Sequence, residues 1–361
     1  MKNNNSSQDN QSQVLYNRIL LAIDVHARYF QVARQLDACP QPSQRMDPDR
    51  FTEFARAQLK LAKAVYAVYE AGPFGYHLAR QLRDMGIECY VMRPQKLDPY
   101  QRRVCTDKTD AREMLADLDR YVRGNPRALC VVQIPTPQQE LRRALSRQRD
   151  ALQKDRLRLA ARGRCLLLTQ GVRVGNYWWK PQFWWMRLRK KLAPELVAIL
   201  EAYRALIEAI QEQIQPLEKA IRAAAPQTLP LGMGALTFEI LLREILRWER
   251  FSNRRQVGSF TGLCGGVSSS GNYHVDLPAT KHGNPRVRGL LIELAWRMVF
   301  YQRAYRPVVK WKSVLEDGRK RARRKQAIVA IGRQLAVDIW KWQTGRAKPE
   351  QLGWVMTPAI I

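Results

Sequence analysis

The segment from Gln139 to Ala225 constrains the fold of this chain most, because its apolar residues follow the period of long helices. One series of leucines recurs every seven residues, at positions 145, 152, 159 and 166. A second series steps by three or four residues: Leu196, Ile199, Tyr203, Leu206, Ile210, Ile214, Leu217 and Ile221. Both spacings place apolar side chains on one face of a helix. We therefore predict two long helices over residues 139–225 that pack as an antiparallel, coiled-coil-like pair.

The region before this pair alternates between strand-like and helix-like patterns. Residues 18–36, RILLAIDVHARYFQVARQL, have the pattern of two strands around a polar turn. The elements expected after them are a helix over 51–63, a strand over 64–69, a helix over 76–85, a strand over 87–92 and a helix after Thr106. This order favours an α/β domain with a mixed sheet over residues 14–138.

The region after the pair is expected to be a mostly helical domain over residues 226–346. Its first part, LGMGALTFEILLREILRWERFSNRRQVGSFTGL, predicts a glycine turn, two short helices and a loop, an order similar to a helix-hairpin-helix element. Such a turn can bring backbone N–H groups to a DNA phosphate. A last basic helix is expected over Arg319–Trp342. The ends of the chain, residues 1–13 and 347–361, are expected to be tails, and the first of them to be disordered.

The charge of the chain points to a polyanionic partner. Its 361 residues include 61 Lys and Arg against 32 Asp and Glu, a formal charge of +29, and nucleic acid would neutralise it. No apolar run approaches the ~20 residues that span a bilayer, and the start is not signal-like, so we expect a cytoplasmic protein of bacterial type without a membrane partner, associated with the nucleoid when bound. The six cysteines are scattered without a CxxC pair, which argues against a zinc site or a disulfide framework.

The most basic part of the chain lies within the predicted helix pair. Residues 142–191 contain fifteen Lys and Arg, and their only acids are Asp150 and Asp155. Near the middle, residues 177–185 carry four tryptophans and a tyrosine. Aromatic rings among cations can stack on unpaired bases, which favours contact with nucleic acid. The alternative is a tryptophan mini-core that holds the helix tips together.

Four acidic residues occupy positions at which an α/β domain can hold a metal. Asp24 lies in an apolar strand, where an unpaired charge is costly, and Glu70 closes the next strand. Asp107 and Asp110 are three residues apart at the start of a predicted helix and can face the same way. Taken singly, each also suits a turn, a solvated strand end or a helix cap. Together they supply the hard oxygen ligands that Mg²⁺ prefers.

A glycine-rich stretch in the C-terminal region contains three consecutive serines. GLCGGVSSSG occupies residues 262–271, and KHGNPRVRGLLIELAW follows from residue 281. Taken alone, a serine in such a stretch is an ordinary loop residue. With its neighbours, the run 260–296 resembles the C-terminal domain of the DEDD transposases of insertion sequences, the family that includes the Piv-type DNA invertases. The motifs are Phe260-Thr-Gly-Leu263, Ser270-Gly271, Lys281-His-Gly-Asn284 and Arg288-Gly-Leu-Leu291.

The N-terminal region is similar to the acidic motifs of the same family, in the same order. These motifs are Ile-Asp-Val-His at 23–26, Tyr-Glu-Ala-Gly at 69–72 and Thr-Asp-Lys-Thr-Asp-Ala at 106–111. The resemblance thus covers about residues 18–342. Two positions depart from the family pattern: Ala27 and Gly265 stand where members often have Lys and Pro. Neither departure removes an acid or the serine.

The resemblance implies a DNA transposase or recombinase whose first domain has an RNase H-like, Holliday-junction-resolvase-like fold. It implies Mg²⁺ or Mn²⁺ ligands at Asp24, Glu70, Asp107 and Asp110. It also implies that Ser270, or failing that Ser269, attacks DNA and forms a covalent phosphoserine link. The implied partners are double-stranded donor and target DNA, a bridge RNA that pairs with both, and further copies of the chain. Those copies form a dimer that assembles to a tetramer, in which the acids of one protomer meet the serine of another.

Two other functions remain open from the sequence. The first is a metal-dependent junction-resolving nuclease, in which water attacks the phosphate and the serine stretch only binds DNA. The second is a non-catalytic nucleic-acid-binding protein related to such enzymes.

Overall fold

The computed structural model of the chain describes residues 15–94, 106–180, 184–270, 273–317 and 321–359. The predicted N-terminal tail, residues 1–13, lies outside the described residues. The chain divides into two compact units, Met1–Thr136 and Pro137–Ile361. The first unit is mixed α/β and the second is largely helical, as the sequence predicts.

The first unit is built on one mixed sheet. Its strands are β1 (Tyr16–Val25), β2 (Phe30–Leu36), β3 (Cys39–Pro40), β4 (Gln44–Met46), β5 (Ala62–Glu70) and β6 (Glu88–Met92). Five follow the order β3-β2-β1-β5-β6, and β4 also pairs with β2. β1 is antiparallel to β2 and parallel to β5, and β5 is parallel to β6, which confirms the predicted mixed sheet. The sequence does not predict β3 and β4, because strands of two or three mostly exposed residues show no alternation of apolar and polar side chains.

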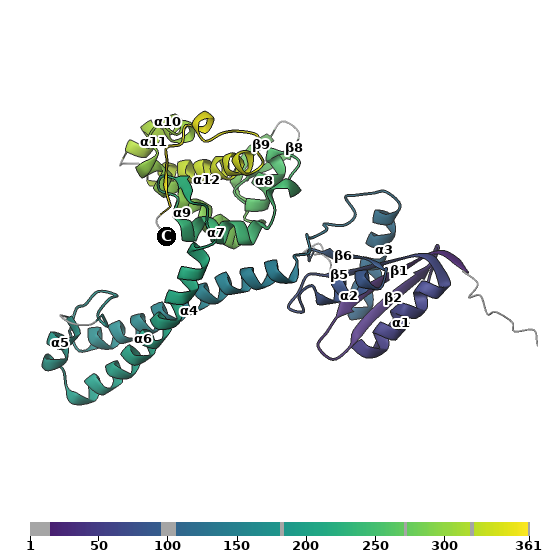
Figure 1. Cartoon of the computed structure of the whole chain (residues 1–361), viewed down its shortest axis with the longest axis horizontal. Helices are drawn as coiled ribbons and strands as arrows, with labels where there is room; N and C mark the ends of the chain where they lie inside the picture. The colour runs from purple at the N-terminus through teal and green to yellow at the C-terminus, as the bar shows by residue number, and fades with distance from the viewer. Residues whose placement is uncertain (1–14, 95–105, 181–183, 271–272, 318–320, 360–361) are drawn as a thin grey trace, which may run out of the picture. The chain divides into compact units, whose positions relative to one another are not determined.

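Helices cover both faces of this sheet. α1 (Pro48–Leu61) and α2 (His77–Asp84) pack on the face that contains positions 19, 21 and 23 of β1. α3 (Asp107–Val122) packs on the face that contains positions 20 and 22. Figure 1 shows α1 and α3 on opposite sides of the strands. Because successive side chains of a strand point to opposite faces, β1 is buried on both sides, which explains its unbroken apolar run.

The predicted helix pair is α4 (Pro137–Thr169) and α6 (Pro194–Arg222), which lie side by side in the second unit (Figure 1). The seam between them differs from the predicted one. The buried residues of α4 are Ser146, Ala160, Gly163 and Leu167, while Leu145 of the predicted heptad is 40% exposed. The buried residues of α6 are Leu200, Ile207, Ile214 and Ile221, while Ile199 and Leu206 are exposed. Gly163 lies against the ring of Trp178, and the Oγ of Ser146 accepts a hydrogen bond from Arg243 at 3.4 Å. The small buried residues of α4 are therefore covered by these neighbours, and the leucine heptad does not mark the buried positions.

The Trp-rich segment between these helices forms a small core. It includes α5 (Trp184–Leu188) and a 3-10 turn (Arg189–Lys191), and its residues 181–183 lie outside the described part of the chain. The rings of Trp178, Trp179 and Trp185 are buried against the helix pair. Nε1 of Trp178 donates a hydrogen bond to the Ala160 carbonyl oxygen at 2.8 Å. Of the two alternatives for this segment, these three rings therefore form the mini-core.

The rest of the second unit is a helical domain with two small sheets. Its elements are β7 (Thr228–Pro230), α7 (Ala235–Ile245), η2 (Trp248–Arg250), α8 (Arg254–Thr261), β8 (Gly265–Ser270), β9 (Tyr273–Ala279), α9 (Pro285–Tyr301), α10 (Arg306–Lys310), α11 (Lys312–Glu316), α12 (Arg321–Gln343), η3 (Glu350–Leu352) and β10 (Met356–Pro358). One core joins α7, α8, α9 and α12, and α12 is the predicted last helix. Its predicted first residues, 319 and 320, lie outside the described residues. No helix in the described part of the chain has both the length and the apolar character to cross a membrane.

The glycine turn before α7 is a packed corner. The N–H of Leu231 donates to the Val355 carbonyl oxygen at 2.8 Å, and that of Met233 donates to Pro230 at 2.8 Å. A Cβ on Gly232 would lie 2.8 Å from the ring of Tyr301. The N–H groups of Leu231 and Met233 therefore bond within the protein. In the phosphate-binding turn expected from the sequence, such groups would point to DNA.

Residues 347–359, expected to be a tail, pack on the same domain. Leu352 and Trp354 are buried in its core, and β10 pairs antiparallel with β7. η3 and β10 are three residues long, too short to show a pattern in the sequence. Leu352 and Trp354 are the large apolar residues that could have indicated this packing.

Candidate metal centre and serine hairpin

Asp24 and Glu70 lie at the C-terminal ends of two neighbouring strands, on the same face of the sheet: Asp24 is one residue before the end of β1 and Glu70 is the last residue of β5. β1 and β5 are parallel, in a register that brings the two residues level one position beyond the last paired residues. Ala22 and Val68, two residues before each acid, pack on α3. Because alternate side chains of a strand share a face, both carboxylates belong to the α3 side of the sheet.

The start of α3 brings two more carboxylates to this edge. Thr106 caps the helix, its Oγ1 accepting a hydrogen bond from the N–H of Thr109 at 3.3 Å. Asp107 and Asp110 follow in the first turn, and the neighbouring Ala111 is buried against the sheet. The N-terminus of a helix favours negative charge, so the same two acids suit both the cap and a metal site.

His26 lies between two of these carboxylates. Its Nε2 is 3.0 Å from Oδ2 of Asp24 and 3.4 Å from Oδ2 of Asp107. One ligand atom from each of the three residues lies within 4.8 Å of the others, an arrangement that can hold a metal ion. The hydroxyl of Tyr29 donates a hydrogen bond to Oδ2 of Asp107 at 3.0 Å. Sequence reasoning missed His26 as a site residue, although the Asp-x-His spacing was the available signal.

The charges of neighbouring carboxylates also act on the other two acids, Glu70 and Asp110. Burial raises the pKa of the Glu70 carboxyl, and the charges of Asp24 and Asp110 raise it further. Burial also raises the pKa of the Asp110 carboxyl, with the charges of Asp24 and Asp107 adding to it. Oδ1 of Asp110 is buried and has no hydrogen-bond partner among the described residues. Neighbouring carboxylates repel one another when they are charged, unless a cation lies among them.

The residues present fit a divalent cation. Carboxylate oxygens are the ligands that Mg²⁺ and Mn²⁺ prefer. The side chains of Asp24 and Asp107 are 26% and 46% exposed, so a phosphate group can reach them. The structure thus brings all four predicted acids to one edge of the first unit, and this edge is a possible acidic metal site.

Ser270 belongs to the second unit and lies on a β-hairpin, where a loop was expected. β8 and β9 are antiparallel, with Ser270 opposite Tyr273. Ser268, Ser269 and Ser270 are all exposed, and Gly271 of the predicted motif lies outside the described residues. The glycines permit close strand pairing, since a Cβ on Gly266 would lie 3.2 Å from Leu277. Because side chains alternate along a strand, Ser268 and Ser270 share one face and Ser269 has the other.

The base of this hairpin is closed by the two flanking motifs. The N–H of Lys281 donates to the Gly262 carbonyl oxygen at 3.1 Å, and that of Asn284 donates to Phe260 at 3.0 Å. Gly262 ends α8 in the left-handed region with φ +67°, and a Cβ on Gly283 would lie 2.2 Å from the Phe260 oxygen. The motifs at 260–263 and 281–284 are therefore two halves of one structural clasp.

A buried charge network joins this clasp to α4. The side chain of Glu244 is 1% exposed, and its carboxylate accepts hydrogen bonds from Arg147 at 3.0 and 3.1 Å and from Asn284 Nδ2 at 3.1 Å. Oδ1 of Asn284 accepts from the N–H of Arg286 at 3.0 Å and so caps α9. Burial acts to raise the pKa of Glu244, but the bonds from Arg147 and Asn284 outweigh it and lower the pKa.

Comparison with known proteins places the chain among transposases. Residues 227–309 match a family model described as Transposase IS116/IS110/IS902 family. The predicted transposase y4rJ of Sinorhizobium fredii is 32% identical over 328 residues, which cover 81% of this chain and 81% of its own length. The transposase for insertion sequence element IS1111A of Coxiella burnetii is 27% identical over 290 residues, 76% of each chain. The transposase for IS1533 of Leptospira borgpetersenii is 24% identical over 305 residues, 78% of this chain and 86% of its own.

The first of these matches is longer than either compact unit, so the likeness includes parts of both. The family model covers the serine hairpin and its clasp. The chain therefore belongs to the IS116/IS110/IS902 family of transposases, DNA-binding enzymes that catalyse the transposition of insertion sequences.

Proposed function

We propose that this transposase cuts and rejoins DNA through a covalent phosphoserine link, with Ser270 as the nucleophile and the acid cluster as its metal centre. The first unit is accordingly assigned an RNase H-like, Holliday-junction-resolvase-like fold. The observation that carries the proposal is the meeting of acids from β1, β5 and α3, where burial, and then repulsion between the carboxylates, raises the pKa of two of them. A divalent cation would relieve that repulsion.

In the proposed centre, oxygens of Asp24, Glu70, Asp107 and Asp110 would hold Mg²⁺ or Mn²⁺, which would polarise a DNA phosphate. Strand ends and a helix start hold these carboxylates in place. The hydrogen bond from Tyr29 orients Asp107. His26 contacts Asp24 and Asp107 together and keeps both turned toward the same point.

Ser270 performs the transfer in this proposal. Its Oγ attacks the phosphorus atom, so that an O–P bond to serine forms while the bond from phosphorus to one sugar oxygen breaks. The serine proton is lost and the leaving sugar oxygen takes one up. Attack by another DNA hydroxyl on the same phosphorus then releases serine and rejoins the strand without hydrolysis. The exposed position of Ser270 on a hairpin with a closed base supports this role.

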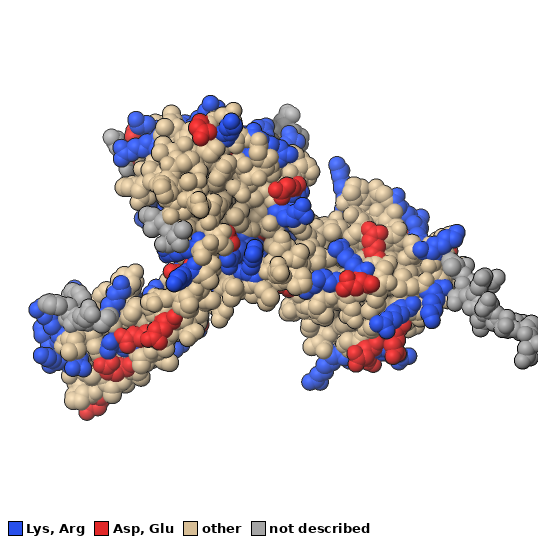
Figure 2. Space-filling view, in the orientation of Figure 1, with Lys and Arg blue, Asp and Glu red and all other residues tan. Residues whose placement is uncertain are grey.

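The proposed assembly contains further copies of the chain and a bridge RNA. The acids and the serine belong to different compact units, which supports action of each serine on the acids of another protomer in a dimer that assembles to a tetramer. Exposed cations at the tip of the helix pair support contact with nucleic acid (Figure 2): Arg187, Arg189, Lys190 and Lys191. Base pairing with the RNA would then select donor and target DNA.

The test is covalent capture of the protein on nicked DNA, with Mg²⁺ and RNA transcribed from the DNA that flanks the gene. We expect an adduct that survives denaturation with the wild type and with Ser268→Ala, and none with Ser270→Ala. Ser268 is the matched control because it is exposed on the same face of the same strand. An adduct that persists in Ser270→Ala overturns the assignment, and its additional loss in Ser269→Ala identifies the neighbouring hydroxyl instead.

The two alternative functions give other results. A junction-resolving nuclease uses water as its nucleophile, so it cleaves DNA in the Ser270→Ala variant and forms no adduct. A non-catalytic relative binds DNA but does not recombine two plasmid-borne sites, with or without Asp24→Asn. Membership of a transposase family argues against this second alternative.

A further inference from the structure

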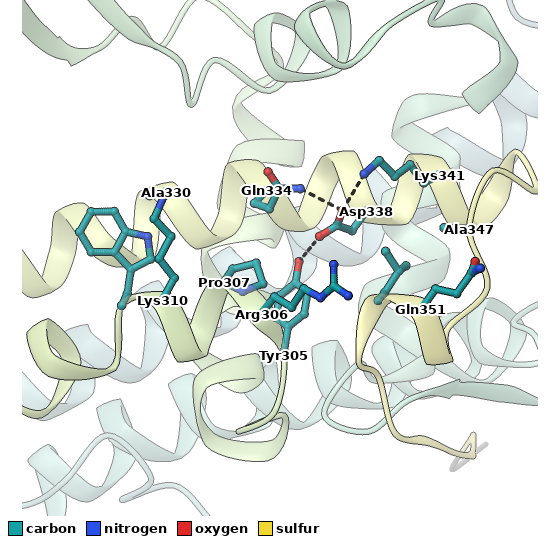
Figure 3. Close-up of a pocket in the computed structure, with 12 residues that line it drawn as sticks. Tyr305, Arg306, Pro307, Lys310, Ala330, Gln334, Asp338, Lys341, Ala347 and Gln351 are labelled. Atoms are coloured by element: carbon teal, nitrogen blue, oxygen red, sulfur yellow. Dashed lines mark hydrogen bonds and ion pairs between the residues drawn. The ribbon is translucent and has the colours of Figure 1, made fainter.

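The second unit contains a pocket that shares no residue with the serine hairpin or its clasp. It lies between α10, α12 and η3 (Figure 3), and its volume is about 470 Å³. Sites for small molecules commonly have roughly 300–1,000 Å³. The pocket is therefore large enough for a ligand the size of one nucleotide.

The floor of the pocket is a hydrogen-bonded group around a buried acid. The hydroxyl of Tyr305 donates to Oδ2 of Asp338 at 2.7 Å, and Nε2 of Gln334 donates to Oδ1 at 2.9 Å. Nζ of Lys341 lies 3.7 Å from the same Oδ1. Tyr305 and Asp338 are 1% and 4% exposed, whereas Gln334 is exposed. The hydrogen bond to Asp338 thus fixes the side-chain amide of Gln334, and the carbonyl oxygen of that amide can accept a hydrogen bond from a ligand.

The rim of the pocket is cationic. Arg306, Lys310 and Lys341 line it, and Asp338 is its one acid, which gives three positive charges against one negative. Figure 3 shows Lys310 at one end of the pocket and Lys341 at the other, with Arg306 beside Tyr305 between them. Arg306 and Lys310 are exposed, so their side chains can follow a ligand as it enters. This excess of charge favours an anionic group such as a phosphate.

The walls of the pocket suit a flat ring. Trp311 and Pro307, next to Lys310 and Arg306 in the chain, supply an aromatic and an apolar surface, and Leu352 lines the pocket as well. An indole ring stacks on any nucleobase, because every base has a π face. An amide next to such a ring can bond to the edge of the base, and cations at the rim can bind its phosphate.

We propose that this pocket binds a single nucleotide, with its base against Trp311 and Pro307 and its phosphate at the exposed Arg306 and Lys310. The nucleotide is either a free mononucleotide or an unpaired nucleotide of a bound DNA or RNA strand. In a DNA-binding enzyme, an unpaired nucleotide held here would fix a strand away from the reacting phosphate. The proposal goes beyond the phosphoserine mechanism and uses neither its serine nor its acids.

Calorimetric titration of the full chain with AMP, GMP, CMP, UMP and inorganic phosphate tests the pocket. We expect at least one nucleotide to bind with a Kd of about 1 mM or tighter, and phosphate to bind at least about tenfold more weakly. Lys310→Glu, which reverses a rim charge, and Ala330→Trp, which fills the pocket, should each weaken the nucleotide at least about tenfold. Lys312→Glu is the matched control, because its side chain is 70% exposed nearby and does not line the pocket.

Three results overturn the proposal: no nucleotide binds the wild type, both pocket variants bind it unchanged, or phosphate binds as tightly as the nucleotides. The exposed Lys310 keeps the test decisive even where Ala330→Trp disturbs the fold. A short single-stranded oligonucleotide then distinguishes the two sources. Its binding is weakened by Ala330→Trp where the nucleotide belongs to a strand, and is unchanged where a free nucleotide is the ligand; either result supports the pocket. Ser270 takes no part in these titrations, so their failure leaves the phosphoserine proposal standing.

Discussion

Glu70 and Asp110 are residues whose charge opposes the fold of the protein when no cation is bound. Burial and neighbouring carboxylates raise the pKa of both side chains. A divalent ion reverses the effect, because it binds the deprotonated carboxylates and adds its binding free energy to the stability of the folded state. Substitution of single residues can separate these two contributions.

Asp110→Asn is expected to raise the Tm of the metal-free protein by about 2–4 °C and to remove most of the further rise that Mn²⁺ produces. The substitution removes one of the repelling charges, at a residue whose Oδ1 has no hydrogen-bond partner among the described residues. Thermal unfolding with and without Mn²⁺ measures both effects. Asp119→Asn is the control on the same helix. Arg18 and Arg123 contact the Asp119 carboxylate at 3.4 and 2.8 Å, so the substitution removes favourable ion pairs and the Tm of this variant should fall. A lower Tm for metal-free Asp110→Asn contradicts the account.

The pH dependence of stability should have the sign of a raised pKa. The folded state holds the proton of Glu70 more tightly than the unfolded state, so in the metal-free protein this residue opposes folding near pH 7 and stops opposing it as the pH falls through its folded pKa. Glu70→Gln should therefore be the more stable protein at about pH 7, and the difference from wild type should shrink toward about pH 5. Thermal unfolding across this range checks the trend. A difference that grows toward acid pH is the opposite of what we expect.

Among the elements, apolar periodicity predicted the strands and long helices but not the packed face of each helix. Gly163 of α4 is buried because the ring of Trp178 lies on it, and Ser146 is buried where Arg243 contacts it. A search for leucines passes over such small residues. Glycines at 265 and 266 indicated a loop, yet they permit the close pairing of β8 with β9. Packing between elements decided both cases, and periodicity within one element does not encode it.

Gly163→Ala is expected to disrupt the tip of the helix pair. A Cβ at this position would lie 2.0 Å from Cζ2 of Trp178, so the indole ring must leave its place. Overpacking of this kind costs typically about 1–3 kcal/mol of unfolding free energy. Chemical denaturation followed by tryptophan fluorescence measures the loss. Gly175→Ala is the control, since no atom of the described residues lies within 4 Å of its Cβ, and equal effects of the two substitutions would refute this packing.

Glu244→Gln is expected to loosen the connection between α4 and the serine hairpin, at a cost of about 2 kcal/mol. The change removes the charge that Arg147 and Asn284 bond. Because the pKa of Glu244 is lowered in the folded state, its contribution is present above the unfolded pKa and is lost as the pH falls through the folded one. Denaturation of the wild type and of Glu244→Gln across the acid pH range measures how the difference in their unfolding free energy depends on pH. Glu316→Gln, at a side chain that is 66% exposed, should change little, and an unaffected Glu244→Gln protein rules the connection out.

In the whole molecule, the acids and the serine belong to two compact units. That the four acids meet at one edge of the sheet could be predicted, because two lie at the ends of strongly patterned strands, two begin a helix, and the family motifs repeat those positions. Their role in binding metal stays a prediction. His26 and the contacts of Glu244 could not, because they depend on which side chains meet across elements far apart in the sequence. The division into units itself suggests an experiment on mixed protomers.

Asp24→Asn and Ser270→Ala proteins should each be inactive in plasmid recombination, whereas a mixture of the two should recover activity. In a mixed oligomer, an intact serine hairpin from one chain can meet intact acids from the other. Recombination assays at several ratios of the two proteins measure the recovery, which should be highest near equal amounts. No recovery in an oligomer shown to contain both chains would contradict transfer between protomers.

Calorimetric titration of the protein with Mn²⁺ tests the proposed metal centre most directly, since acids from β1, β5 and α3 must hold a divalent ion together. We expect saturable binding in the wild type, binding weakened at least about tenfold in Asp24→Asn and in Asp107→Asn, and unchanged binding in Asp119→Asn. Wild-type protein that does not bind Mn²⁺, or binding that survives both Asp24→Asn and Asp107→Asn, would contradict it.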